Sequence, residues 1–206
     1  MDFIEKLRTE LQKPLPGEQS QFEMASGNRI FYKEFEQTEP HRHGSVLICL
    51  YLHDAKWSVV FIKRTVGHGP HSGQMAFPGG MVEEDDEDLF ATAIREAEEE
   101  VGIKKDQIEF VGELSPLHIP VSNIMVHPYI VSMNGKPILV GSKDEVEAIL
   151  ETPIEVFLDI KNHSSFTFEY KEKTYTSPCF IIDGYKIWGA TAMIWNEFLS
   201  VYKNIK

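Results

Sequence analysis

Residues 79–103 read GGMVEEDDEDLFATAIREAEEEVGI, and this stretch carries the strongest helical pattern in the chain. We expect a helix from about Glu87 to Val101, because its apolar residues recur on one face of a wheel turned by about 100° per residue. Gly102 follows where a left-handed C-terminal cap belongs. The apolar stripe, which should face the core, consists of Phe90, Ala93, Ile94, Ala97 and Val101.

A second face of the same helix carries three glutamates, Glu96, Glu99 and Glu100. Like charges at this spacing destabilise an isolated helix by roughly 0.2–0.5 kcal/mol. Mg²⁺ prefers oxygen ligands and commonly binds one or two carboxylates together with water and substrate phosphates. The helix alone leaves two interpretations open, an ordinary solvated acidic face and a cation site.

The segment REAEEEVGI, from Arg95 to Ile103, resembles the second half of the Nudix box. The usual box has one glutamate six residues after its glycine and eight residues before its arginine. Here the position six residues after Gly80 is Asp86, whereas the position eight residues before Arg95 is Glu87, so the first half is one residue longer. The longer loop looks like the coenzyme A pyrophosphatase branch of the family. We expect most of the acidic run 83–88 to cap the helix, whose N-terminal dipole favours negative charge. The roles of Asp86 and Glu87 stay open.

Two flanking segments extend the resemblance. HSGQMAFPGG (71–80) is similar to a signature of that branch, which ends in Phe-Pro-Gly-Gly, and the match reaches back to Arg64. Gly69 stands where the branch usually has a further arginine. IWGATAMIWNEFL (187–199) resembles the C-terminal helix of the branch, so that residues 45–202 fit the pattern.

Composition limits the classes of ligand. A formal charge of −12 on 206 residues disfavours general nucleic-acid binding, which relies on Lys and Arg contacts to phosphate. An anionic ligand therefore needs a divalent cation or a local basic patch. No apolar run reaches the roughly 20 residues of a membrane span, and the N-terminus lacks a secretory pattern. We expect a cytoplasmic protein in which Cys49 and Cys179, both in apolar stretches, are buried free thiols.

The rest of the chain interleaves strands and helices, which predicts an α/β (α+β) class. We expect an N-terminal helix and extension over 1–35 and the main domain over 36–206. Helices are predicted at 3–11 and 191–202, and strands at 45–53, 57–64, 108–113, 127–133, 166–170 and 178–182. Connecting segments are predicted as a hairpin turn at 54–56, a polar surface loop at 41–43, a Gly-, His- and Pro-rich loop at 66–80, and a short helix that starts at Asp144 before Pro153.

The resemblance implies a Nudix-type α/β/α sandwich with a mixed β-sheet that uses Mg²⁺ (or Mn²⁺) to hydrolyse a pyrophosphate bond. The implied metal ligands are Glu96, Glu99, Glu100 and a backbone carbonyl near Gly80. The implied catalytic residues are Glu96 as a candidate general base, Glu99, Glu145 as a second acidic element, and Arg95, which would orient a carboxylate through a bidentate pair. For substrate binding it implies Arg64, His71, Gly79 and Gly80, with Lys63 less favoured. Glu145 and His71 each have a purely structural alternative.

The implied substrate is a small nucleotide. Coenzyme A or an acyl derivative, split into 3′,5′-ADP and 4′-phosphopantetheine, is the leading hypothesis. ADP-ribose, a dinucleotide or an oxidised nucleotide would use the same site, and a non-catalytic nucleotide-binding sensor domain is an alternative from another class. We expect no nucleic-acid or membrane partner. A homodimer is one possible oligomeric state.

Overall fold

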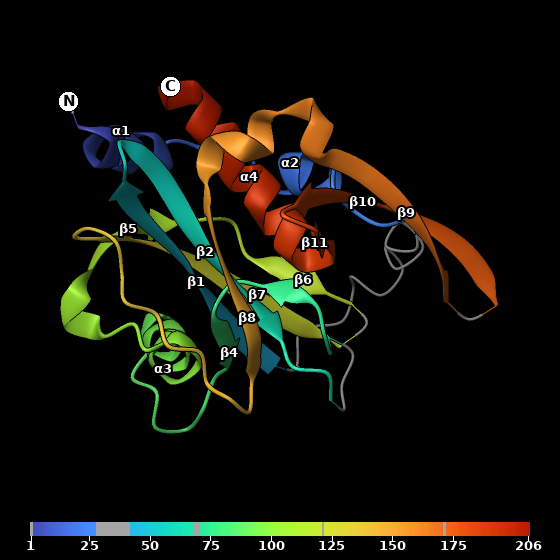
Figure 1. Ribbon diagram of the computed structural model, residues 1–206, viewed down its shortest axis with the longest axis horizontal. Coiled ribbons are helices and arrows are strands. Elements are labelled where there is room, and N and C mark those ends of the chain that lie inside the picture. The colour runs from blue at the N-terminus through green and yellow to red at the C-terminus, as the bar shows by residue number, and fades with distance from the viewer. Residues whose placement is uncertain (1, 28–41, 68–70, 121, 171) are drawn as a thin grey trace.

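The computed structural model describes residues 2–27, 42–67, 71–120, 122–170 and 172–206 (Figure 1). The boundary expected between residues 35 and 36, and the interpretations of His41 and Gly69, lie outside these residues. Within the described ranges, no helix has both the length and the apolar character needed to cross a membrane.

The centre of the fold is a mixed sheet of eight strands. Its strand order is β3-β2-β1-β7-β5, and in addition β4 pairs with β1, β6 with β7 and β8 with β2. The β1–β7 pair is parallel and the remaining pairs are antiparallel. The strands are β1 Arg42–His53, β2 Lys56–Arg64, β3 Met75–Ala76, β4 Gly79–Met81, β5 Ile108–Glu113, β6 Leu117–Ile119, β7 Ile124–Met133 and β8 Val146–Pro153.

A smaller antiparallel sheet adjoins this body, with β10 between β9 and β11. The β9–β10 hairpin projects away from the rest of the molecule (Figure 1). The strands are β9 His163–Tyr170, β10 Lys173–Ile182 and β11 Tyr185–Trp188. The helices are α1 Phe3–Leu11, α2 Glu18–Phe22, α3 Leu89–Val101 and α4 Gly189–Ile205, with short 3-10 turns η2 Lys105–Gln107, η3 Ile154–Leu158 and η4 Ile160–Asn162.

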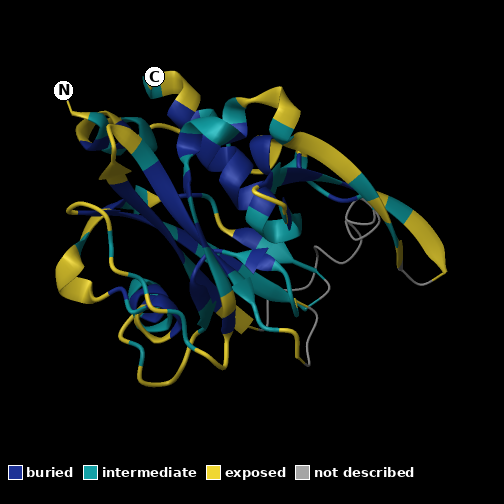
Figure 2. Cartoon of the chain, in the orientation of Figure 1, coloured by how far each residue is buried: buried dark blue, intermediate teal, exposed yellow. Residues whose placement is uncertain are grey.

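Helices cover both faces of the central sheet (Figures 1 and 2). α3 packs on one face, where Ala93 and Ala97 join a buried cluster with Leu47 and Cys49 of β1. α4 lies on the opposite face, and α1 and α2 pack against it. This arrangement confirms the expected α/β/α sandwich with a mixed sheet.

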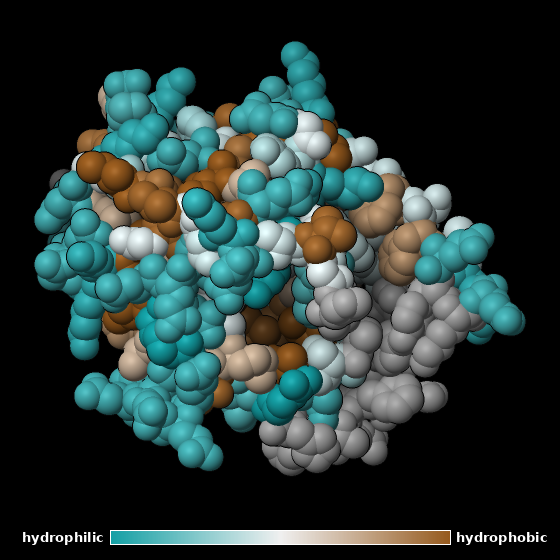
Figure 3. Space-filling view, turned by 60° about the horizontal axis from the view of Figure 1, so that its bottom comes forward, coloured by the Kyte–Doolittle hydropathy of each residue, from teal (hydrophilic) through white to brown (hydrophobic). Residues whose placement is uncertain are grey.

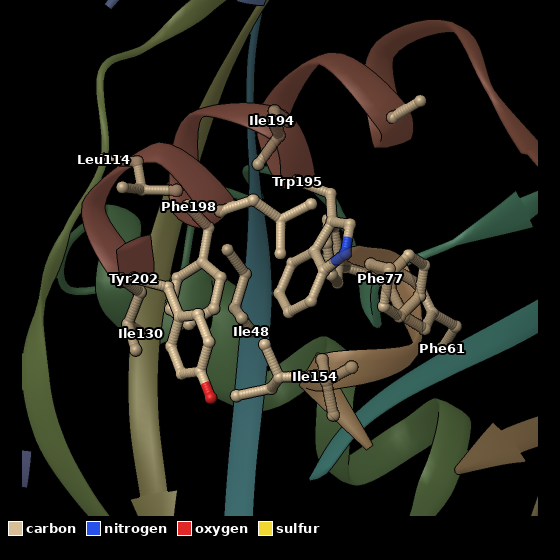
Figure 4. Packing of buried hydrophobic residues seen from close by; sticks show 14 of the residues in the cluster. Ile48, Phe61, Phe77, Leu114, Ile130, Ile154, Ile194, Trp195, Phe198 and Tyr202 are labelled. Atoms are coloured by element: carbon tan, nitrogen blue, oxygen red, sulfur yellow. The ribbon is translucent and has the colours of Figure 1, made fainter. Parts of the chain in front are cut away.

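The larger core cluster gathers around α4 (Figure 4). The ring of Trp195 is fully buried, stacks on Phe198 at a centroid distance of 4.5 Å, and meets Phe61 and Phe157 edge-on. Large buried aromatic rings dominate core energetics, so this packing fixes α4 firmly. At the start of α4, Thr191 Oγ1 donates to the carbonyl of Met75 in β3 (3.0 Å). The core thereby anchors the segment that leads into β4.

The structure confirms the predictions that rest on local signals. α1 and β5 have the predicted bounds, and Cys49 and Cys179 are buried free thiols. α3 begins at Leu89, slightly later than expected, because the Asp88 side chain accepts a hydrogen bond from Ala91 N (2.7 Å) as the N-cap. Gly102 has a φ of 74°, which confirms the left-handed cap.

The predicted helix at Asp144 is wrong. Residues 143–145 form a turn, and β8 then pairs with β2, with Ile149 opposite Ile62. A strand partner far away in sequence here overrides the local helical tendency of an acidic segment before a proline.

Three loop predictions also need correction. Arg42 and His43 belong to β1 and pair with Ile124 and Met125 of β7, so the described part of the predicted surface loop is strand. The β1–β2 turn consists of two residues, at positions 54 and 55, both with positive φ, as is typical of tight hairpins. The loop predicted over 66–80 contains β3 and the start of β4, because these short strands pair with β2 and β1.

Candidate active site

Two glycines in β4 bring the backbone close to α3. A Cβ atom on Gly79 would collide with the Ser45 carbonyl of β1, and Gly79 has a φ of 151°, which L residues rarely adopt. A Cβ atom on Gly80 would occupy the position of the Glu96 carboxylate. The Gly-Gly pair therefore allows the edge of the sheet to contact the acidic face of α3 directly.

Glu100 is the most deeply buried member of the acidic face, with no exposed surface. Its carboxylate accepts hydrogen bonds from Gly79 N (2.9 Å) and from Arg64 Nη1 (3.1 Å). The pKa of Glu100 is raised to about 7, mainly by burial. The hydrogen bond from Gly79 N–H and the charge of Arg64 oppose this shift, and the charges of Glu96 and Glu145 add to it. A cation placed among these groups would stabilise the ionised carboxylate.

Glu96 and Glu99 lie nearer the surface. The Glu96 side chain is 16% exposed, and that of Glu99 is 55% exposed. Burial raises the pKa of Glu96, Arg95 opposes this effect, and Glu99 and Glu145 add to it by charge repulsion. The three box glutamates and Glu145 therefore share one region of negative potential.

Arg95 makes the bidentate ion pair expected of it, and its partner is Asp86. Arg95 Nε donates to Asp86 Oδ1 (2.9 Å) and Nη2 to Asp86 Oδ2 (3.0 Å), while Nη2 also donates to the Met81 carbonyl (3.0 Å). Asp86 further accepts from Glu83 N (2.9 Å) and Thr92 Oγ1 (2.8 Å). Arg95 holds the pKa of Asp86 well below its usual range. Asp86 thus fastens the loop to α3.

The prediction that most of the acidic run caps the helix needs correction. Asp88 alone supplies the side-chain N-cap of α3, Asp86 is the ion-pair partner, and Glu87 is exposed. The sequence offered no signal for the Asp86–Arg95 pair, because the path of the loop between β4 and α3 decides which carboxylate reaches the guanidinium.

The remaining predicted residues lie on the β2 side of the site. Arg64 ends β2, and its Nη1 also lies 3.4 Å from the Gly79 carbonyl. Glu145 precedes β8, and its carbonyl accepts from Thr65 N (2.9 Å). His71 contacts Gln74 (3.4 Å) in the loop before β3, and Lys63 pairs with Glu147 at the surface (2.6 Å). The pairing of β8 with β2, rather than a helix, brings Glu145 toward the glutamates of α3.

The donor set fits a hard divalent cation by its chemistry. Carboxylates that raise one another's pKa, beside a glycine whose missing side chain leaves space for the Glu96 carboxylate, are the oxygen donors that Mg²⁺ and Mn²⁺ accept. In the described part of the chain, however, no three His, Cys, Asp or Glu side chains are already grouped to hold a metal ion. Glu100 is turned to Arg64 and Glu96 to Arg95, so cation binding requires these carboxylates to change partners.

Figure 3 shows a face of the molecule on which hydrophilic residues predominate, with a hollow near its middle whose floor is hydrophobic. Glu99 and Arg95 are among the residues that line an open hollow along α3 and the loop before it. The chain thus combines a Gly-Gly strand end, a capped acidic helix and an arginine-tied loop in the order of the Nudix box.

Comparison with known proteins gives the same family. The NUDIX domain model matches residues 41–171. The chain is 35% identical over 169 residues to "Nudix hydrolase 15, mitochondrial" from Arabidopsis thaliana, covering 79% of this chain and 59% of that protein. It is 30% identical over 161 residues to the "Uncharacterized Nudix hydrolase NudL" of Escherichia fergusonii, covering 78% of this chain and 83% of that protein. The protein belongs to the Nudix family.

A solved structure supports the fold assignment. RenU, a Nudix hydrolase from M. smegmatis, superposes with a TM-score of 0.53 at 13% identity, covering 80% of this chain and 87% of that one. The chain spans little more than half of the length of the first Arabidopsis relative and of a second one, "Nudix hydrolase 22, chloroplastic".

Proposed function

We propose that the protein is a pyrophosphohydrolase that splits the diphosphate linkage of a nucleoside diphosphate derivative with Mg²⁺ or Mn²⁺. The observation that carries this proposal is the concentration of carboxylates at Gly79-Gly80, where Glu100 is fully buried and Glu96 faces Gly80. Burying several carboxylates together is unfavourable unless a cation or hydrogen bonds compensate. A divalent cation that also binds an anionic substrate would supply this compensation.

Each residue has a role that follows from its position. Glu96, Glu99, Glu100 and the Gly80 carbonyl would hold the metal, which supplies charge neutralisation of the diphosphate and activation of water. Glu96 or Glu145 would accept the proton of the attacking water. Arg64 is partly exposed and pairs with Glu100. Once a cation binds Glu100 instead, Arg64 would be released to bind a substrate phosphate. His71 and the backbone of Gly79 and Gly80 would also contact the substrate.

Glutamine substitutions test the catalytic role. Glu99→Gln and Glu100→Gln should each lower Mg²⁺-dependent turnover by roughly 10²–10³-fold, because each removes a charged ligand of the metal that would stabilise the transition state. Glu98→Gln is the matched control, since Glu98 is exposed on the same helix. Circular dichroism checks that the fold is intact, and chelation with EDTA should abolish turnover. Wild-type turnover in both test variants would exclude this mechanism.

We propose coenzyme A or an acyl-coenzyme A as the substrate, because HSGQMAFPGG and Arg64 resemble that branch of the family. A panel of coenzyme A, 3′-dephospho-coenzyme A, ADP-ribose and a dinucleoside polyphosphate, with products identified by mass spectrometry, separates the candidates. Weak discrimination between coenzyme A and its 3′-dephospho form is expected from Gly69 in place of an arginine. Preference for ADP-ribose or the dinucleotide would overturn the coenzyme A assignment alone.

The sensor alternative predicts nucleotide binding without products from any compound on the panel. The presence of all three box glutamates supports the enzyme instead. The cytoplasmic location, the homodimer and the division at residue 35 stay predictions from the sequence.

A further inference from the structure

A cluster of aromatic rings lies at the N-terminal end of α3, away from Gly79-Gly80. Phe90 of α3 meets Phe110 of β5 edge-on at 5.2 Å and Tyr129 of β7 at 5.2 Å. With Asp88 and Leu89, these rings line an open hollow of about 490 Å³. Phe110 is 48% exposed, although a large apolar side chain at a strand position normally packs inward.

Two carboxylates flank the three rings. Asp88 belongs to the lining itself, and Glu113 lies directly opposite Tyr129 in the β5–β7 ladder, so both side chains project from the same face. The Asp88 carboxylate caps α3 through Oδ1, which accepts a hydrogen bond from Ala91 N (2.7 Å). The hollow therefore joins exposed aromatic surface to negative charge.

The charges around the hollow are consistent with this arrangement. Burial, followed by the charges of Glu113 and Asp88, raises the pKa of Tyr129. His127 lies two residues before Tyr129 on the same face of β7. Burial and the charge of His43 lower its pKa and so disfavour its charged form, against the opposing effect of Glu113. Arg8 donates hydrogen bonds to the Phe110 carbonyl and to the Glu109 carboxylate. Because neighbouring side chains of a strand point to opposite faces, Glu109 and its partner Arg8 lie on the face of β5 opposite to the Phe110 side chain.

We propose that the hollow formed by Phe90, Phe110 and Tyr129 binds an organic cation of the quaternary ammonium class. Aromatic faces attract cations through their quadrupole, and a weakly hydrated alkylammonium gains from apolar contact as well as from nearby carboxylates. The site is separate from the α3 glutamates proposed for catalysis, so its occupation is independent of pyrophosphate hydrolysis.

Binding of tetramethylammonium, followed by NMR titration, tests the proposal. Neopentyl alcohol serves as a neutral probe with a similar branched apolar group, and potassium chloride controls for ionic strength. Saturable binding of the cation, and weaker binding of the neutral probe, is expected. Equal affinity for both probes, or no saturation by the cation, would overturn the proposal.

Variants locate the binding. Phe110→Ala should weaken tetramethylammonium binding by roughly twofold to fivefold, the range that an exposed cation–π contact supplies, and Glu113→Gln should weaken it by a smaller factor. Ile138→Ala removes an apolar side chain that is 89% exposed elsewhere and should change nothing. Unchanged binding in Phe110→Ala, with its fold confirmed by NMR, would place the cation elsewhere and refute the site. Hydrolase activity should be the same in all three variants.

Discussion

Asp86 and Arg95 show how a single ion pair can position the loop between β4 and α3. The Asp86 side chain is 5% exposed and meets the guanidinium through two parallel hydrogen bonds. Arg95 adds the Met81 carbonyl at the end of β4. The pair thereby fixes the distance between β4 and the helix that carries the glutamates, and bidentate geometry makes this contact more specific than a single charge pair.

Replacing Asp86 by asparagine should lower the free energy of unfolding by about 1–2 kcal/mol at neutral pH, since a charge-assisted pair is lost. The folded pKa of Asp86 lies below its unfolded value of about 3.9. Its contribution is therefore complete above that value and disappears as the pH falls through the folded pKa. Denaturant titrations of Asp86→Asn at pH 7 and in strong acid measure this trend. Asp85→Asn changes an exposed neighbour and should have no effect, and equal stability of the two variants would refute the assigned role.

At the scale of an element, α3 depends on defined ends. Its first turn is capped by Asp88, and its last turn ends at Gly102, whose N–H reaches the carbonyls of Ala97 and Glu98. A Cβ atom on Gly102 would have only the Val140 carbonyl nearby, at 4.0 Å. The requirement for glycine is therefore conformational, and it arises from the left-handed backbone rather than from crowding.

Gly102→Ala should accordingly destabilise the protein by about 1–2 kcal/mol, the cost of a left-handed conformation for an L residue. Thermal unfolding monitored by circular dichroism provides the measurement. Gly67→Ala is the control, because no atom lies within 4 Å of its added methyl group and Gly67 lacks a positive φ. A melting temperature of Gly102→Ala equal to that of Gly67→Ala would show that the cap contributes nothing.

The same helix shows what the sequence could predict. The apolar stripe, the glycine C-cap and the three glutamates of α3 follow from local spacing, and the structure agrees with the predicted core face at Ala93, Ala97 and Val101. The prediction of a helix at Glu145 is wrong, because this segment leads into β8, and the pairing of β8 with the distant β2 is not visible in the local sequence. The partner of Arg95 could not be predicted either, because the loop before α3 has no periodic pattern that would indicate which of its carboxylates contacts the guanidinium.

At the scale of the whole molecule, Glu197 joins segments that are far apart in the chain. This residue of α4 is fully buried and accepts hydrogen bonds from Gly17 N (3.0 Å), Gln21 Nε2 (2.8 Å) and Ser115 N (3.3 Å). One carboxylate thus connects the N-terminal segment, the region between β5 and β6, and the C-terminal helix. Residues 2–27 therefore contribute to the same packed body as α4 and the segment between β5 and β6.

Glu197→Ala should lower the free energy of unfolding by at least about 1–3 kcal/mol, because it leaves buried N–H groups without acceptors. Chemical denaturation measures the loss. Glu18→Ala removes an exposed glutamate of α2 and should stay close to the wild type. If Glu197→Ala is as stable as this control, the carboxylate does not hold the three segments together.

The central claim is that the carboxylates of α3 gather a divalent cation at Gly79-Gly80. Titration with Mn²⁺, followed by the loss of its free-ion EPR signal without any substrate, measures this directly. Wild type and Glu98→Gln should bind Mn²⁺ with the same affinity, while Glu96→Gln and Glu100→Gln should bind it at least about tenfold more weakly, since each removes a charged oxygen ligand. Mn²⁺ affinity that is identical in all four proteins would contradict the claim.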